Sequence, residues 1–154
     1  MKNLETATFG AGCFWEPQLV FDQIKGVVET QAGFMGGNVK NPSYLLVCTG
    51  LTGHVEVVQI TFDPKTVSYA RLLKVFWQAH DPAQADGQGV NIGRQYRAAV
   101  FYHNAEQKKL AEKTKKELEK KGMNVATQIL PAGEFYPAEE YHQKYLQKRG
   151  LKTC

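Results

Sequence analysis

A chain of 154 residues has the usual size of a single domain, and one hydrophobic core can stabilise it. Its composition, 43% hydrophobic and 22% charged, is typical of globular proteins and excludes the disordered, fibrous and membrane-embedded classes. The formal net charge of +4 is small, and the lysines of 104–122 alternate with glutamates as on a solvated helix face. We therefore expect no nucleic-acid partner.

The beginning of the chain mixes Lys2 with Glu5 and lacks the apolar stretch of a secretory signal, and no apolar run approaches the length of a membrane span. We expect a cytoplasmic protein that does not bind membranes. Its three cysteines are odd in number and far apart, unlike the disulfide framework of a small secreted domain. Reduced or redox-active thiols fit better at these positions, which are Cys13, Cys48 and Cys154.

The first elements are a strand over 6–11 that ends in glycine and a helix over 14–25 with apolar residues at helical spacing. Pro17 is tolerated only in the first turn of a helix. Cys13 is therefore expected at or just before the helix N-terminus.

A second strand is expected at 27–34, and a short helix near 43–48. The third strand, 54–62, is the most informative, because alternation places Glu56 on the same face as Val58 and other residues that favour burial. A carboxyl group on such a face calls for a chemical explanation.

The later elements begin with a helix over 69–80, capped by the preceding serine. Residues 81–95 contain three glycines and no periodicity, which favours a functional loop. A strand over 96–102, a charged helix over 104–121 and a weaker strand over 124–130 follow.

In chain order, the first two-thirds predict strand, helix, strand, strand, helix and strand, the split βαβ pattern of ferredoxin-like folds. We therefore predict an α+β ferredoxin-like sandwich that forms a single catalytic domain over residues 1–154. An aromatic C-terminal extension is expected to contain a short helix after Pro137. It is expected to end in a mobile tail over about 149–154.

Cys13 and Glu56 are the strongest candidates for chemistry. A thiol at a helix N-terminus meets the positive end of the macrodipole, which favours the nucleophilic thiolate, although an isolated cysteine can also be a small buried hydrophobe. Burial raises the pKa of a carboxyl group, so Glu56 is a candidate general acid unless it is solvated at a sheet edge.

Tyr44 and Tyr96 adjoin glycine-rich loops, where their hydroxyl groups can point into a cleft, although packing is the common role of tyrosine. The cysteines and histidines show none of the spacings of a zinc site, so we expect no metal. Cys48 lies in an apolar run, which favours packing in the core over a role as a relay thiol.

Several ordered blocks cover nearly the whole chain: FGAGCFW at 9–15, GFMGG at 33–37, NPSY at 41–44, TGHVEVV at 52–58, HDP…QG…GRQYR from His80 to Arg97, and YHQKYL at 141–146. Together they resemble the class A methionine sulfoxide reductase family. The resemblance implies reduction of the S epimer of methionine sulfoxide, free or in proteins, by a monomer without a metal or organic cofactor.

The resemblance also implies roles for individual residues. Cys13 would be the nucleophile and Glu56 the acid that protonates the sulfoxide oxygen, which Tyr44 and Tyr96 would hydrogen-bond. The pocket for the substrate methyl group would be formed by Phe14 and Trp15. The sulfenic acid at the nucleophile would be trapped in a disulfide with Cys154, which thioredoxin reduces.

The sequence departs from the family pattern in two places. The run Glu16-Pro17-Gln18 stands where many members carry a glycine and then a glutamate. Asn91 stands where many carry an aspartate, and we expect its amide to hydrogen-bond in place of the carboxylate.

Two other interpretations remain open at this point. A thiol peroxidase would form the same sulfenic acid but consume peroxide. A non-catalytic ferredoxin-like binding module would have incidental thiols and no turnover.

Overall fold

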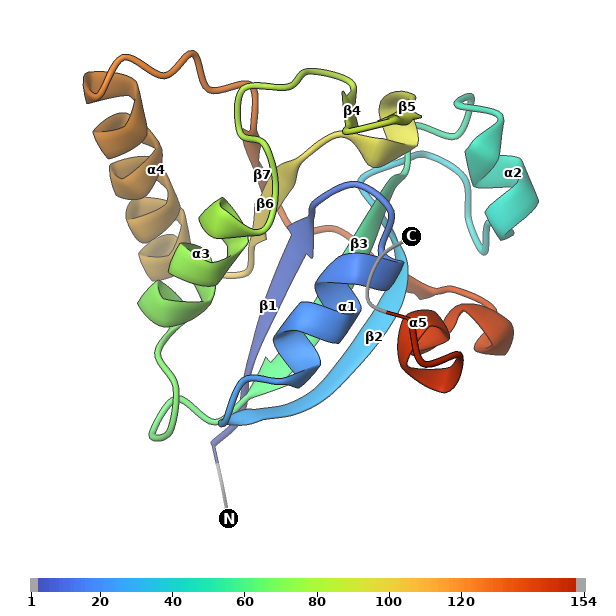
Figure 1. Cartoon of the computed structure of the whole chain (residues 1–154), viewed down its shortest axis with the longest axis horizontal. Helices are drawn as coiled ribbons and strands as arrows, with labels where there is room; N and C mark the ends of the chain where they lie inside the picture. The colour runs from blue at the N-terminus through green and yellow to red at the C-terminus, as the bar shows by residue number, and fades with distance from the viewer. Residues whose placement is uncertain (1–2, 152–154) are drawn as a thin grey trace.

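The computed structural model describes residues 3–151, which form one sheet of six strands, a two-stranded hairpin and helices against the sheet (Figure 1). The sheet strands are β1 (Glu5–Gly10), β2 (Val27–Met35), β3 (Val55–Phe62), β6 (Ala99–Tyr102), β7 (Gln128–Pro131) and β8 (Tyr136–Pro137). The hairpin pairs β4 (Gly87–Gln88) with β5 (Asn91–Ile92). The helices are α1 (Trp15–Asp22), α2 (Tyr44–Cys48), α3 (Tyr69–Gln78), α4 (Ala105–Lys120) and α5 (Tyr145–Lys148), with 3-10 turns η1 (Arg94–Tyr96) and η2 (Glu140–His142).

The strand order β7-β6-β1-β3-β2-β8 confirms the ferredoxin-like prediction. The four central strands, β6-β1-β3-β2, pair in antiparallel fashion and come from the two split βαβ units. The rest of the chain adds one strand at each edge, with β7 parallel to β6 and β8 antiparallel to β2. The C-terminal extension, residues 136–151, therefore returns to the β2 edge, where Figure 1 places α5 beside α1.

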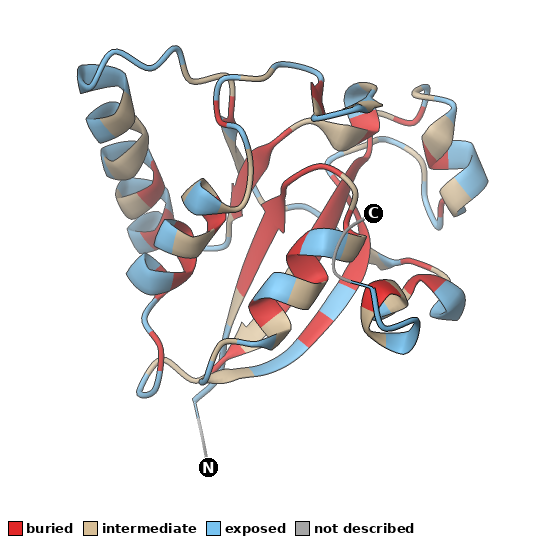
Figure 2. Cartoon of the chain, in the orientation of Figure 1, coloured by how far each residue is buried: buried red, intermediate tan, exposed pale blue. Residues whose placement is uncertain are grey.

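One face of the sheet packs on the helices and forms the main core, as the red segments of Figure 2 indicate. Phe9 of β1 lies at its centre, with ring centroids 5.5 Å from Phe21 of α1 and 4.8 Å from Phe76 of α3. Alternation along β3 sends Val58 and Ile60 to this same face. Glu56 has the same parity, so it also faces the helices.

The opposite face of the sheet is covered in part by the segment that follows β7. Val55 and Val57 are fully buried there with Phe135 packed against their cluster. The approach is close, because a Cβ added at Gly33 would lie 2.5 Å from the Phe135 ring. Much of β3 is therefore buried on both faces, which a simple two-sided alternation does not predict.

Some predicted boundaries were wrong. The first helix ends at Asp22 rather than 25, before a Gly26 that adopts a φ of +102°. The strand expected at 96–102 begins only at Ala99, because 94–96 form η1. The guanidinium group of Arg97 stabilises that turn by donating to the carbonyl oxygens of Arg94 and Gly53.

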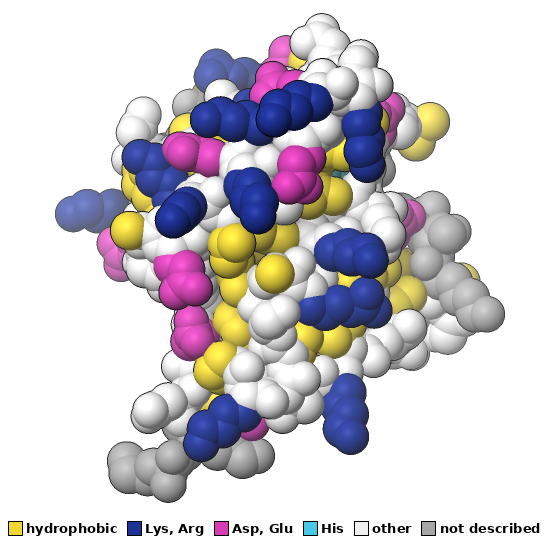
Figure 3. All heavy atoms as spheres, turned by 90° about the vertical axis from the view of Figure 1, so that its left-hand side faces the viewer, with side chains coloured by type: hydrophobic (Ala, Val, Ile, Leu, Met, Phe, Trp, Pro, Cys, Tyr) yellow, Lys and Arg dark blue, Asp and Glu magenta, His cyan; other side chains and the backbone are white. Residues whose placement is uncertain are grey.

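The charged helix α4 agrees with its prediction. Its N-cap is Asn104, whose side-chain oxygen accepts from the Gln107 N–H at 2.9 Å. On the side of the molecule that carries α4, Lys and Arg side chains are interspersed with Asp and Glu (Figure 3). None of the helices within 3–151 is both long and apolar enough to cross a membrane.

Candidate active site

Cys13 lies in the short connection between β1 and α1. Phe14 is the N-cap of α1, and its carbonyl oxygen accepts from the Gln18 N–H at 3.2 Å. The connection approaches the β4–β5 hairpin so closely that a Cβ at Gly12 would lie 2.7 Å from the Gln88 side chain, and Gly12 has a φ of +83°. As predicted, Cys13 therefore directly precedes the N-terminal turn of a helix.

Glu56 is buried beneath that turn, with only 1% of its surface exposed. Its Oε1 accepts a hydrogen bond of 3.2 Å from the backbone N–H of Phe14, the residue after Cys13. Among residues 3–151, Oε2 has no hydrogen-bond partner. Burial raises the pKa of Glu56 to about 8, against the weaker opposing effect of the Phe14 hydrogen bond. The carboxyl group is therefore largely protonated at neutral pH.

Tyr44 and Tyr96 bring two phenol groups to the same region from α2 and η1. Burial raises the pKa of both hydroxyl groups, and the nearby Glu56 carboxylate raises both further. The neighbouring Tyr44 hydroxyl group acts in the opposite direction and lowers the pKa of Tyr96. Both phenols therefore remain neutral hydrogen-bond donors near the carboxyl group.

Cys48 lies beside Tyr44 rather than in the core. The two residues are one helical turn apart in α2, and each side chain shifts the pKa of the other. Burial raises the pKa of the Cys48 thiol, and the neighbouring Tyr44 hydroxyl group lowers it. The preference for core packing was thus wrong, because the thiol is only partly buried and lies near Tyr44 and Glu56.

Phe14 and Trp15 form an aromatic wall next to Cys13, but they differ in exposure. Phe14 is fully buried against Phe34 and Tyr44, whereas Trp15 is partly exposed. The C-terminal extension holds Trp15 in place, because Tyr145 of α5 stacks on the Trp15 ring with ring centroids 3.7 Å apart. Of the two side chains, Trp15 therefore has more surface available to a bound substrate.

Two glutamine side chains attach the C-terminal extension to the β2 edge and α1. The Gln143 amide pairs with Ala32 of β2, accepting from its N–H at 2.9 Å and donating to its carbonyl oxygen at 2.8 Å. Gln18, fully buried in α1, accepts from the Lys144 N–H at 2.8 Å and donates to the Thr30 carbonyl oxygen at 3.3 Å. The departure at Gln18 thus leaves the first turn helical and gives it a role in this attachment.

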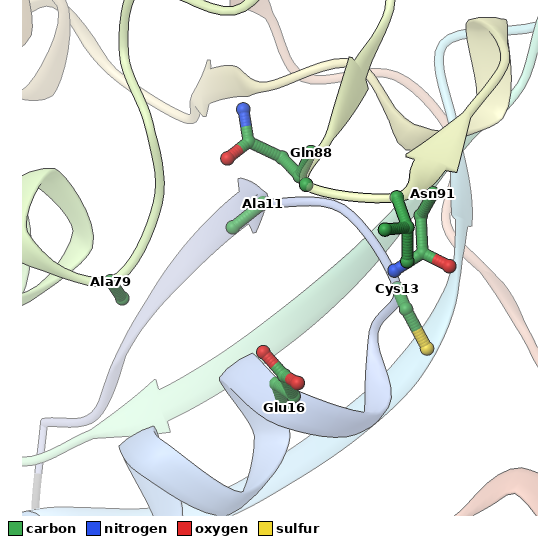
Figure 4. Close-up of a pocket in the computed structure, with 8 residues that line it drawn as sticks. Ala11, Cys13, Glu16, Ala79, Gln88 and Asn91 are labelled. Atoms are coloured by element: carbon green, nitrogen blue, oxygen red, sulfur yellow. The ribbon is translucent and has the colours of Figure 1, made fainter. Parts of the chain in front are cut away.

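A pocket of about 470 Å³ opens beside Cys13 on the side of the hairpin. In Figure 4, Asn91 of β5 lies next to Cys13, while Glu16 and Ala79 project from α1 and the end of α3. The lining residues are Ala11, Cys13, Glu16, Ala79, Gln88, Gly89, Val90 and Asn91. Asn91 and Cys13 therefore line the same pocket, and the hydrogen-bonding role of the amide stays a prediction.

Within the described part of the chain, no three His, Cys, Asp or Glu side chains gather as a metal site. The groups near the thiol include the protonated carboxyl group of Glu56, two phenols and the Asn91 amide, and the Glu16 carboxyl group lines the same pocket. This set can deliver a proton to a polar group bound next to a sulfur nucleophile.

The family model described as "Peptide methionine sulfoxide reductase" matches residues 5–154. The chain belongs to this family. A peptide methionine sulfoxide reductase MsrA from Methanoculleus marisnigri is 54% identical over 156 aligned residues, covering 99% of this chain and 95% of the relative.

Solved structures of this reductase family share the fold. The reduced form of Mxr1 from Saccharomyces cerevisiae has a TM-score of 0.92 at 33% identity, covering 98% of this chain and 88% of Mxr1. Mxr1 in complex with Trx2 has a TM-score of 0.66 at 26% identity, covering 92% of this chain and 84% of Mxr1. The family and the enzyme class expected from the sequence are confirmed.

The structure gathers most of the residues that the sequence analysis selected for a methionine sulfoxide reductase site. Those brought together are Cys13, Phe14, Trp15, Tyr44, Glu56, Tyr96 and Asn91. Cys154 lies outside the described residues. The sequence analysis missed His142 and Tyr145, which contact the aromatic wall. Both lie in the YHQKYL block, so the block itself was the available signal.

Proposed function

We propose that Cys13 reduces the S epimer of methionine sulfoxide and that Glu56 supplies the proton the reaction needs. The Cys13 thiolate attacks the sulfoxide sulfur while the Glu56 carboxyl group protonates the sulfoxide oxygen. The oxygen is transferred to the Cys13 sulfur, which becomes a sulfenic acid. The substrate sulfur thereby gains an electron pair, and the cysteine sulfur loses one. Methionine is released, and Glu56 is left as a carboxylate that water reprotonates.

The observation that carries this proposal is the bond between Glu56 and the backbone next to the nucleophile. Because Oε1 accepts from the Phe14 N–H, Oε2 is the oxygen available to carry the proton. A pKa of about 8 keeps that proton in place at neutral pH and lets it leave when a strong acceptor arrives. Tyr44 and Tyr96, as neutral phenols, supply further hydrogen bonds to the oxygen as its charge develops.

The proposed binding site lies between the aromatic wall and the hairpin. Trp15 contacts the substrate methyl group, Phe14 supports the wall from the core, and the Asn91 amide hydrogen-bonds on the hairpin side.

We further propose that Cys154 completes the cycle. Its thiol attacks the Cys13 sulfenic acid to form a disulfide and water, and a dithiol protein of the thioredoxin class then reduces the disulfide. Mxr1, whose structure with Trx2 is known, is a relative at 26% identity and supports this class of partner. We place the single domain in the cytoplasm, where thiols remain reduced. Of the tail expected over about 149–154, residues 149–151 are hydrogen-bonded to α5, with the Gly150 and Leu151 N–H groups donating to the carbonyl oxygens of Gln147 and Leu146, and residues 152–154 lie outside the described residues.

The direct test is reduction of a methionine sulfoxide peptide with dithiothreitol as the reductant and hydrogen peroxide as the comparison substrate. We expect turnover of the sulfoxide in preference to peroxide, whereas a thiol peroxidase shows the reverse preference and a binding module shows neither. Peptide mapping after one turnover without reductant should find a Cys13–Cys154 disulfide. A Cys13–Cys48 disulfide instead would contradict the role of Cys154.

A further inference from the structure

His142 is a buried imidazole that no step of the proposed reaction uses. Only 2% of its surface is exposed, whereas the preceding residues Glu140 and Tyr141 are exposed. Its ring contacts the aromatic side chains that border the candidate substrate site. Ring centroids lie 4.2 Å from Tyr44, 5.3 Å from Phe14 and 5.8 Å from Trp15.

The protonation of His142 follows from its hydrogen bond to Trp15. The Trp15 Nε1–H lies 3.1 Å from Nδ1 of His142, and an indole nitrogen can only donate. Nδ1 must therefore accept, which requires a neutral ring with its proton on Nε2. Burial lowers the pKa of His142, although the Glu139 carboxylate acts in the opposite direction, so the acceptor form is favoured.

Two contacts from the same segment fix the Trp15 indole. His142 holds its edge through the hydrogen bond, and Tyr145 covers one face at an interplanar angle of 7°. The Arg149 guanidinium lies 3.8 Å from the centre of the Tyr145 ring and stabilises it in turn. The partly exposed Trp15 side chain is thereby limited to one orientation beside Cys13.

We propose that His142 is a positioning residue that sets the size selectivity of the substrate pocket by fixing the indole of Trp15. This inference rests on the proposed function, in which Trp15 contacts the methyl group on the sulfoxide sulfur. A fixed wall limits the space for that substituent, whereas an indole that can rotate admits a larger one. A rigid pocket therefore discriminates between alkyl groups that differ by one methylene.

The test compares N-acetyl-methionine sulfoxide with N-acetyl-ethionine sulfoxide, whose sulfur carries an ethyl group. The measured quantity is the ratio of kcat/KM for the two substrates, with dithiothreitol as reductant. His142→Leu removes the acceptor, and we expect the preference for the methyl compound to fall by about two- to tenfold, the scale of one lost hydrogen bond. KM for the methyl compound should rise more than kcat falls, because the reacting groups remain in place.

A conservative variant and a remote control separate positioning from general damage. The Asn side chain places its oxygen close to the position of Nδ1, so His142→Asn should restore most of the selectivity. Trp77 offers a matched control, because its indole Nε1–H donates to Thr114 Oγ1 at 2.9 Å between α3 and α4. Thr114→Val removes an equivalent indole hydrogen bond and should leave the selectivity ratio unchanged.

The indole N–H signals in a proton–nitrogen correlation spectrum report the Trp15–His142 hydrogen bond without any measurement of turnover. The chain has two tryptophans, so each serves as a reference for the other. In His142→Leu the Trp15 indole signal should shift while the Trp77 signal stays in place, and Thr114→Val should do the reverse. If His142→Leu fails to fold, both indole signals will move to the positions typical of an unfolded chain. The comparison is then made with His142→Asn instead.

The decisive comparison uses a double-mutant cycle with Trp15→Phe, which lacks the indole N–H. In that background His142→Leu should no longer change the selectivity ratio. An equal change in both backgrounds, or an unchanged ratio in folded His142→Leu, would overturn the role of His142. If the wild-type chain reduces neither sulfoxide, the proposed function fails instead, so the two failures are distinguishable.

Discussion

The β1–α1–β3 region and the C-terminal extension over 136–151 build two sides of one site by different means. In the first region, strand alternation and a helix N-terminus place Glu56 beside Cys13, and a large aromatic core holds both elements. The extension contains only β8, η2 and a single short helix, and it depends on the amides of Gln143 and Gln18. The reacting groups thus stand on rigid elements, whereas the substrate wall depends on a few specific hydrogen bonds.

This difference predicts that changes in the first region abolish chemistry, while changes in the extension alter binding. Loss of a reacting group removes transition-state stabilisation and lowers kcat. Loss of a contact that only shapes the wall raises KM.

The largest effect is expected for Cys13→Ser, which should remove turnover, because a hydroxyl is a far weaker nucleophile than a thiolate at neutral pH. The fold should remain, since the Cys13 side chain is only partly buried. Initial rates with dithiothreitol and the melting temperature check both expectations. Substantial residual turnover would refute the role of Cys13.

The next effect is expected for Glu56→Gln, which keeps the size of the side chain and an oxygen that can accept from the Phe14 N–H. We expect kcat to fall by about a hundredfold or more, the usual scale for a lost general acid. Alkylation of Cys13 by iodoacetamide should proceed at nearly the wild-type rate.

The matched control for this variant is Glu29→Gln, which changes an exposed carboxylate on the adjacent strand β2. Its rate should equal that of the wild type. A Glu56→Gln rate within a few-fold of wild type would mean that another group donates the proton.

Glu56 should also make stability depend on pH. Its pKa is about 8 in the folded chain against 4.5 for an ordinary glutamate, so between these values the folded state holds a proton that the unfolded state has released. The free energy of unfolding should therefore fall as pH rises through this window, by at most about 5 kcal/mol. Urea unfolding at several pH values should show this slope in the wild type and lose it in Glu56→Gln. An identical slope in both proteins would show that Glu56 titrates normally.

The first region could be predicted from sequence because its rules are local. Pro17 fixed the start of α1, and the alternation in β3 placed Glu56 on the helical face. The extension could not be predicted in the same way, since its contacts join distant residues without periodicity. Trp15 and His142 are 127 residues apart in the sequence, and no local pattern connects them.

Cys48 shows a different kind of error. Its apolar neighbours favoured the core, but α2 is a short surface helix in which Leu45 is exposed. The spacing of four residues from Tyr44 to Cys48 was the better signal, because it places both side chains on one helix face. The helical spacing between Cys48 and the candidate site residue Tyr44 would have placed this thiol beside the site.

The smallest effect is expected for Gln143→Ala, which tests the extension directly. The variant removes the acceptor for the Ala32 N–H and the donor to the Ala32 carbonyl oxygen, so stability should fall by about 1–3 kcal/mol. His142 adjoins Gln143 and should lose its fixed position, so KM should rise a few-fold while kcat changes little. The control is Gln128→Ala, an exposed glutamine of β7, which should change neither quantity. A fall in kcat as large as the rise in KM would mean that the extension also positions the reacting groups, and the two regions would then act as one unit.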